Sequence, residues 1–324
     1  MTTRRTFVQG AMAATAATAL TRPAFAQQDY PNRPIHVVIG FAAGSGADIL
    51  CRFYTSKLAE LSGQTVVIDN KPGAVGVIAG NIVAKAKPDG YTILWCGNSI
   101  MVGGQYLVKD MPFDPVKEFI SAGAFLETPF VIAVGAQSSA KNVAELVTLL
   151  KSKKQNRSAY TNPTGQLSTA LFKTRTGVES EPVSYKTTGD AIPDLVNGTL
   201  DYMILDGTFA VGQVKSGRIR VLAATSAGRI SALPDVPTMQ EAGIPDYVFS
   251  PWWGAYLPAG TPQPIVDKVA GWMSQMAKAP ESAKFLDTMA ALPVLDSARE
   301  MDERLKRDRS MWDKLASDAK LSPS

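Results

Sequence analysis

The sequence has very few of the residues from which active sites and metal sites are built. Its 324 residues include one histidine, His36, and two cysteines, Cys51 and Cys96. A serine or cysteine nucleophile that relies on histidine would have to use His36, and three scattered residues cannot form a Cys/His metal cluster. We expect His36 to lie in a strand, satisfied by local hydrogen bonds. The two cysteines could approach each other above a sheet, but nothing in the sequence fixes their geometry.

The sequence also lacks an apolar run long enough to cross a membrane. The stretch from Gly10 to Leu20 is too short to span a bilayer. It follows the twin-arginine pattern Thr3-Arg4-Arg5-Thr6-Phe7-Val8 and precedes Ala24-x-Ala26, which fits cleavage before Gln27. Residues 1–26 are therefore predicted to be a twin-arginine signal peptide, although the ordinary secretion route stays open. The mature chain is expected in the bacterial periplasm, where a disulfide is permitted.

An excess of charge of one sign is missing as well. The formal net charge is +4, and removal of residues 1–26, which hold Arg4, Arg5 and Arg22 and no acid, lowers it to +1. No long run of like charge occurs. A nucleic-acid-binding protein would carry a basic patch, so we expect no nucleic-acid partner.

The elements that are present alternate between strands and helices. Apolar, β-branched runs predict strands at 35–39, 64–69 and 91–96, and helical periodicity follows the first two of them. This alternation predicts the α/β class, with a parallel sheet covered by helices. The mature chain is long enough for two domains.

A loop of small residues, Gly40 to Ala47, stands between the first strand and its helix. The first turn of a helix presents unpaired N–H groups and a partial positive charge, so this loop predicts an anion site. The alternative is that its glycines only turn the chain. Asn98 and Ser99 end the third strand beside this loop and could donate to a ligand or form a local turn.

The same loop imitates a dinucleotide-binding fingerprint. Gly44-x-Gly46 lies at a strand–helix junction, and Asp69 ends the next strand about twenty residues on. Ile49 takes the position of the third glycine, and four residues precede the glycine pair where the fingerprint turns at once. An exported oxidoreductase using NAD is therefore an alternative that the loop only weakly supports.

The second half of the chain repeats the arrangement. A strand at 158–161 is followed by the polar turn 162–166 and by a helix at 167–174, which Thr164 or Gln166 could cap, with Ser168 and Thr169 in its first turn. This is a second helix N-terminus suited to an anion. A further strand, 200–205, ends in Asp206.

Several motifs in this order resemble the periplasmic solute-binding proteins of tripartite tricarboxylate transporters, the TctC or Bug family. The resemblance covers essentially the whole mature chain and implies a two-lobed, Venus-flytrap, type II-like periplasmic binding protein, each lobe a mostly parallel sheet flanked by helices. It implies a first lobe at 27–127, a second at 128–226, and a return to the first at 227–324. The most specific motifs are Pro88-Asp89-Gly90-Tyr91-Thr92, Tyr185-Lys186 with Gly189, Leu233-Pro234-Asp235-Val236-Pro237-Thr238 and Pro258-Ala259-Gly260-Thr261-Pro262.

The resemblance also implies where a ligand binds. Family ligands are small carboxylates held by one loop from each lobe, and the matching loops are the two helix N-termini found above. Because a carboxylate repels a bound carboxylate, we expect Asp48 to cap the helix, order waters or accept from the loop's own amides rather than touch the ligand. The expected ligand-binding residues are Phe41, Ser45, Gly46, Ala47, Asp48, Asn98, Ser99, Thr164, Gly165, Gln166, Ser168, Thr169 and Asp206.

Two features depart from the family pattern or leave it open. Ala42, Ala43, Gly44 and Ser45 replace the prolines and second glycine of the usual first loop, which should loosen it because proline fixes φ. The pair Trp252-Trp253 could line the cleft and favour an aromatic acid, or pack in the core.

Together these features predict a monomeric periplasmic protein that is not an enzyme and uses no cofactor or metal. It would capture a small carboxylate or dicarboxylate and pass it to the membrane permease subunits of a tripartite tricarboxylate transporter. The alternatives are the exported oxidoreductase and an orphan sensor that signals to a membrane kinase.

Overall fold

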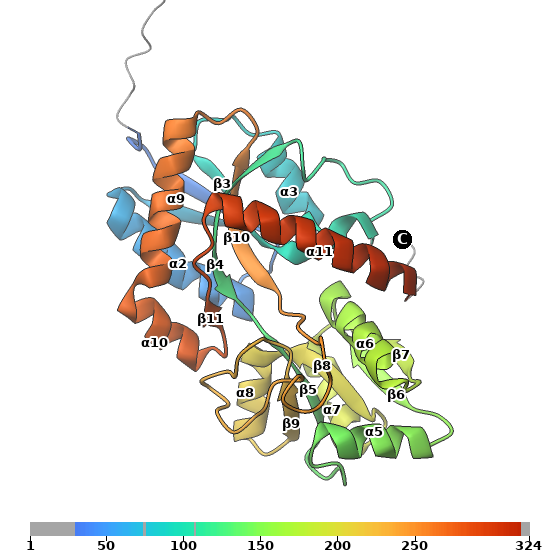
Figure 1. The fold of residues 1–324 in the computed structure, drawn as a ribbon. Coiled ribbons are helices and arrows are strands. Elements are labelled where there is room, and N and C mark those ends of the chain that lie inside the picture. The colour runs from blue at the N-terminus through green and yellow to red at the C-terminus, as the bar shows by residue number, and fades with distance from the viewer. Residues whose placement is uncertain (1–29, 74–75, 107, 319–324) are drawn as a thin grey trace, which may run out of the picture.

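The computed structural model describes residues 30–73, 76–106 and 108–318, so the predicted signal peptide lies outside the described residues. Two sheets organise this part of the chain (Figure 1). The first has the order β11-β4-β10-β3-β1-β2. Its strands are β1 (Ile35–Ile39), β2 (Val66–Asn70), β3 (Thr92–Gly97), β4 (Phe119–Glu127), β10 (Trp252–Pro258) and β11 (Leu292–Pro293).

The second sheet has the order β7-β6-β8-β5-β9 and is built from one continuous part of the chain. In each sheet the strand that enters from the other sheet, β10 or β5, runs antiparallel to both of its neighbours. The strands of the second sheet are β5 (Phe130–Gly135), β6 (Arg157–Tyr160), β7 (Glu181–Ser184), β8 (Tyr202–Asp206) and β9 (Ile219–Ala224).

The chain crosses between the sheets at residues 127–130 and 249–252, which we call the junction. We call residues 30–127 with 252–318 the first lobe, and residues 128–251 the second. The sequence suggested a return after residue 226, but the following segment stays with the second sheet. Thr238 bridges to Ala224, and the N–H of Phe249 donates to the carbonyl oxygen of Thr225 at 3.0 Å. Ile230 and Leu233 bury their side chains there, which explains the later return.

Helices cover both faces of the first sheet. α2 (Gly46–Ser62) and α9 (Gln263–Lys278) bury Tyr54 and Trp272 on one face, with α10 (Pro280–Thr288) beside them. α3 (Val77–Ala84) and α11 (Ala298–Asp318) bury Val83 and Trp312 on the other. Figure 1 shows α11, in red, running across the first lobe toward α6 (Pro163–Thr176), which it contacts. Among the described helices, none is both long and apolar enough to cross a membrane.

The remaining helices belong to the end of β3 and to the second lobe. α4 (Asn98–Met101) follows β3 directly and leads into the short 3-10 helix η2 (Gly103–Tyr106). The second lobe holds α6 together with α5 (Val143–Ser152), α7 (Thr188–Asn197) and α8 (Gly207–Lys215).

Both cysteines are buried free thiols. Cys51 belongs to the apolar cluster under α2 and α9, whereas Cys96 belongs to the cluster on the opposite face of β3. The sheet therefore lies between the two side chains, which is why their proximity in the fold yields no disulfide. Burial raises the pKa of both thiols.

Candidate ligand-binding site

Four helices begin at the junction because the strands that precede them end there. The pair Gly97↔Trp253 places the end of β3 beside the returning strand, and the pair Asp206↔Phe130 does the same for β8. Since β1 runs parallel to β3, and β6 parallel to β8, their carboxyl ends reach the same edge. The helices α2, α4, α6 and α8 therefore turn their N-termini toward the junction, where open α/β sheets bind ligands.

The N-terminus of α2 keeps two amides free. Ser45 is the N-cap, and its hydroxyl accepts from the N–H of Asp48 at 3.2 Å, while the N–H of Gly44 is taken by the carboxylate of Asp48 at 2.8 Å. Among the described residues, no acceptor lies within hydrogen-bond reach of the N–H of Gly46 or Ala47. Gly46 is exposed and Ala47 half-buried, so these donors can meet an anion.

Asp48 is held inside the loop. Its side chain is 1% exposed, and its carboxylate accepts from Nε of Arg52 at 2.7 Å and from Nδ2 of Asn70 at 2.9 Å, besides the N–H of Gly44. Burial alone would raise the pKa of Asp48, but hydrogen bonds from Arg52, Asn70 and Gly44 lower it. The carboxylate thus serves the loop's own amide, in line with the repulsion argument above.

The N-terminus of α6 lies in the second lobe. The sequence suggested Thr164 or Gln166 as its cap, but the helix starts earlier, at Pro163, and Asn162 caps it by accepting from the N–H of Gly165 at 2.9 Å. Proline at the first helical position explains the early start, since its fixed φ suits a helix and it has no N–H to satisfy. Thr164 is buried and Gln166 half-buried.

The hydroxyls expected in the first turn of α6 face inward. Ser168 is fully buried, with its hydroxyl 2.9 Å from that of Tyr247, which also donates to the carbonyl oxygen of Ser168 at 2.6 Å. Thr169 is 3% exposed and donates to the carbonyl oxygen of Gly165 at 2.8 Å. Both side chains are engaged within the second lobe.

Asp206 caps α8 and brings the second lobe close to the first. Its Oδ1 accepts from the N–H of Phe209 at 3.0 Å, and burial raises its pKa, although the helix amides act in the opposite direction. Thr208, the second residue of the helix, donates to the carbonyl oxygen of Met289 in the first lobe. A Cβ on Gly46 would lie 3.8 Å from the methyl of Thr208, so the N-termini of α2 and α8 are neighbours.

Asn98 and Ser99 occupy the first turn of α4. Asn98 is 4% exposed, and its Nδ2 donates to Oδ2 of Asp308 on α11 at 2.7 Å. Nε1 of Trp252 donates to the same oxygen at 2.7 Å. Asn98 therefore ties α4 to α11, while Ser99 remains half-buried.

The aromatic residues near the junction pack in the interior. Trp252 is 1% and Trp253 5% exposed. The ring of Phe41 packs on Trp253 with centroids 4.9 Å apart, and Nε1 of Trp253 donates to the hydroxyl of Thr128 at 3.3 Å. Both tryptophans thus have the core role that the sequence left open.

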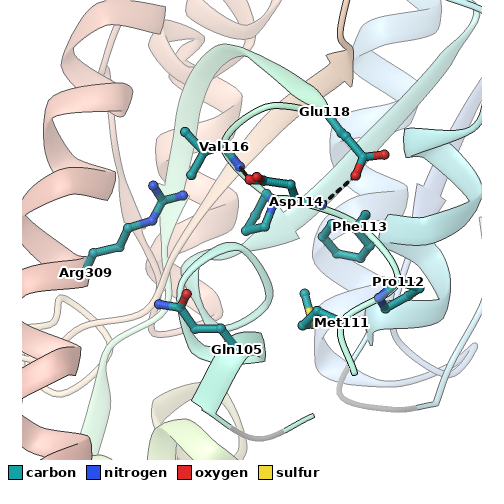
Figure 2. Close-up of a pocket in the computed structure, with 9 residues that line it drawn as sticks. Gln105, Met111, Pro112, Phe113, Asp114, Val116, Glu118 and Arg309 are labelled. Carbon is teal, nitrogen blue, oxygen red and sulfur yellow. Dashed lines mark hydrogen bonds between the residues drawn. The ribbon is translucent and has the colours of Figure 1, made fainter. Parts of the chain in front are cut away.

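A hollow of about 530 Å³ lies elsewhere on the first lobe (Figure 2). It is lined by Arg309 of α11, Gln105 of η2 and the segment 111–118, in which the N–H of Asp114 donates to Oε1 of Glu118 at 2.6 Å. None of the expected ligand-binding residues lines this hollow.

Sequence reasoning missed the side chains that support the site. Asn70, Arg52 and Thr208 each contact a helix N-terminus at the junction without belonging to either loop that was expected to bind the ligand. For Asn70 a signal existed, because it opens the turn Asn70-Lys71-Pro72-Gly73 at the end of the neighbouring parallel strand. No sequence signal pointed to Thr208, since its contact with Gly46 joins the two lobes.

Known proteins match nearly all of this chain. A UPF0065 protein of Bordetella bronchiseptica is 32% identical over 94% of this chain and 91% of its own length. The structure of R. palustris Rpa4515 with adipate superposes with a TM-score of 0.82 at 30% identity, covering 91% of this chain and all of that one. MatC (Rpa3494) from Rhodopseudomonas palustris with bound malate gives a TM-score of 0.75 at 27% identity, covering 88% and 99%. The sequence pattern of the tripartite tricarboxylate transporter family receptors, TctC, matches residues 50–319, and the chain belongs to this family.

Proposed function

We propose that the chain is the solute-binding protein of a tripartite tricarboxylate transporter, and that it captures a small dicarboxylate at the junction. The free N–H groups of Gly46 and Ala47 carry this proposal. They belong to a helix N-terminus, where a carboxylate gains both hydrogen bonds and a favourable dipole. The protein acts without catalysis in the periplasm, as a monomer, and passes its ligand to the membrane permease.

The relatives support a ligand with two carboxylates. One solved structure contains adipate and another malate, and each of these acids has a carboxylate at both ends. A two-headed acid can engage α2 in the first lobe with one end and α6 in the second lobe with the other. Binding then favours the closed arrangement of the lobes, because only that arrangement lets both ends be held.

The energy required is modest. A hydrogen bond to a charged group contributes about 1.5–3 kcal/mol. Micromolar affinity corresponds to about −8 kcal/mol, so about five or six such bonds suffice after the cost of ordering the ligand and the lobes. The N–H groups of Gly46 and Ala47 can supply two of them, while the carboxylate of Asp48 is taken by the N–H of Gly44 and that of Asp206 caps α8.

The first test is thermal unfolding of residues 27–324 with a panel of aliphatic and aromatic mono- and dicarboxylates, amino acids and NAD. A ligand at about one hundred times its Kd stabilises by about 2.7 kcal/mol, which raises Tm by a few degrees. A shift with dicarboxylates supports the proposal. A shift with NAD alone would favour the oxidoreductase instead.

The second test removes one donor without disturbing the helix. Gly46→Pro deletes the free N–H at the first helical position, where proline is well tolerated, and Ser45 already has the extended conformation that precedes proline, with φ −71° and ψ 161°. Gly46→Ala is the matched control, since it keeps the N–H. We expect Gly46→Pro to weaken adipate binding about tenfold or more relative to Gly46→Ala. Equal affinities would contradict a role for this amide.

A further inference from the structure

The loop before α2 lacks the prolines that would stiffen it, yet it is fixed at both ends by one side chain. Nδ2 of Asn70 donates to the carbonyl oxygen of Phe41 at 3.0 Å and to Oδ1 of Asp48 at 2.9 Å. Phe41 is the second residue of the loop, and Asp48 lies in the first turn of α2 directly after it. Both N–H groups of the Asn70 amide are used, one for each end.

The backbone places Asn70 where this is possible. In the parallel pairing of β1 and β2, Asn70 stands opposite Ile39, the last residue before the loop, and the N–H of Lys71 donates to the carbonyl oxygen of Ile39 at 2.8 Å. The side chain therefore starts from a regular strand and reaches over the loop from a rigid position. Loop residues of this kind would otherwise be costly to order, because each fixed backbone residue loses about 1–2 kcal/mol of entropy.

Arg52 completes a ring of side chains. Its Nε donates to Oδ2 of Asp48 at 2.7 Å, and its Nη2 lies 3.4 Å from Oδ1 of Asn70. The negative charge of Asp48 is thereby matched by a cation one helical turn away, on the same helix. A carboxylate held in this way leaves the neighbouring free amides available to an external anion and reduces the repulsion it meets.

We infer that Asn70 is the positioning residue of the ligand site: it holds the loop so that the N–H groups of Gly46 and Ala47 stay free while the Asp48 carboxylate is turned inward. This inference rests on the proposed function, because it supplies the reason why a loop without proline can present a preformed anion site. Asn70 itself contacts the loop and not the ligand.

Asn70→Asp gives the sharpest test. It keeps the size of the side chain but replaces the two donors by a carboxylate beside Asp48. Two adjacent carboxylates cannot both ionise without strong repulsion, so one pKa rises, and at lower pH a shared proton restores the bond to Asp48 but not the one to the carbonyl oxygen of Phe41. The groups that face the Asp48 carboxylate are Arg52 and Cys51 on its own helix, the N–H of Gly44, and Asn70 from β2; Cys51 is a buried thiol whose pKa is raised.

The adipate affinity of Asn70→Asp is compared with that of wild type at about pH 7.5 and about pH 5.5. We expect a loss of about tenfold at the higher pH and a partial recovery at the lower one, because one of the two bonds is restored. Asn70→Ser, which replaces the two amide donors by one hydroxyl on a shorter side chain without adding charge, should weaken binding at both. Lys71→Gln is the matched control: this exposed neighbour changes the net charge by the same amount without touching the loop, so its ratio to wild type should not vary with pH. A pH-independent ratio for Asn70→Asp would overturn the inference.

Hydrogen exchange at the N–H of Gly44 separates this inference from the proposed function. That amide is bonded to Asp48 without any ligand, so its exchange should accelerate in Asn70→Asp and Asn70→Ser but not in Lys71→Gln. If wild type bound no acid of the panel, the proposed function would fail while this readout still tested Asn70. Unchanged exchange in both Asn70 variants would overturn the positioning role even if adipate binds.

Discussion

The hydroxyl of Thr208 donates a 2.6 Å hydrogen bond to the carbonyl oxygen of Met289 and so joins the two lobes beside the ligand loop. Ala290, the next residue along the chain, is fully buried in the apolar cluster of the second lobe, although it belongs to the first. It adopts a left-handed backbone conformation with φ 51°. The turn between α10 and β11 is therefore docked on the first turn of α8 by both a polar and an apolar contact.

Thr208→Val should weaken this connection. Valine keeps the shape and the methyl group near Gly46 but cannot donate, so the carbonyl oxygen of Met289 loses its partner. We expect the free energy of unfolding to fall by about 1 kcal/mol, measured by urea denaturation. Thr199→Val, at an exposed threonine in the same lobe, is the control. Equal stabilities of the two variants would mean that the bond contributes nothing in solution.

The strands and the first helix N-terminus could be predicted because their signals are local. The run from Ile35 to Ile39 is strand β1 as expected, and β2 and β3 differ from the predicted strands by one or two residues at their ends. β-Branched apolar residues bounded by turn residues explain this agreement. The loop before α2 could be recognised for the same reason, since strand, glycine-rich turn and helix follow one another directly.

The partners of the site residues could not be predicted, because they lie far away in the chain. Ser168 faces Tyr247, 79 residues later, and Asn98 faces Asp308, 210 residues later. A single sequence shows that a serine stands near the start of a helix but not which side of the helix is covered there. The same limit applies to the residue at which the chain returns to the first lobe. The segment after β9 stays in the second lobe because of tertiary contacts, so the chain crosses back only at residues 249–252.

Ser168→Ala tests the inward orientation of this hydroxyl. Because Ser168 is fully buried and bonded to Tyr247, its loss should reduce the free energy of unfolding by about 1 kcal/mol and leave adipate affinity within about twofold. Urea denaturation and calorimetry measure the two quantities. Tyr247→Phe removes the other hydroxyl of the pair and should behave alike. A tenfold loss of affinity in Ser168→Ala alone would instead indicate that the hydroxyl reaches the ligand.

Asp308 should be required as an acceptor and not as a charge. One oxygen of its carboxylate accepts from both Asn98 and Trp252, two buried donors. Asp308→Leu leaves both donors without a partner and should cost about 2–4 kcal/mol. Asp308→Asn keeps an acceptor oxygen and should cost much less, the more so because burial raises the pKa of Asp308 and so opposes its charge. Equal losses in urea denaturation would contradict this assignment.

The two thiols should be inert in the folded protein. Cys51 and Cys96 are both fully buried, and burial raises their pKa values, which removes the reactive thiolate. We expect neither to react with Ellman's reagent until the chain is unfolded, when both should react. A reducing agent should leave Tm unchanged. If neither thiol reacted in the unfolded chain before a reducing agent was added, or if Tm fell on reduction, the two cysteines would form a disulfide. Their positions on opposite faces of the first sheet do not allow one.

Protonation of Asp48 should make the protein less stable in acid. Its pKa is lowered in the folded chain because the hydrogen bonds from Arg52, Asn70 and Gly44 outweigh the effect of burial. A carboxyl with a lowered folded pKa stabilises the fold above its unfolded pKa of about 3.9, and this contribution disappears as the pH falls through the lower, folded value. The difference in unfolding free energy between wild type and Asp48→Asn should therefore be largest near about pH 7 and shrink below about pH 4. Urea denaturation across this range measures it, and a difference that grew toward acid pH would mean that the folded chain raises the pKa of Asp48 instead.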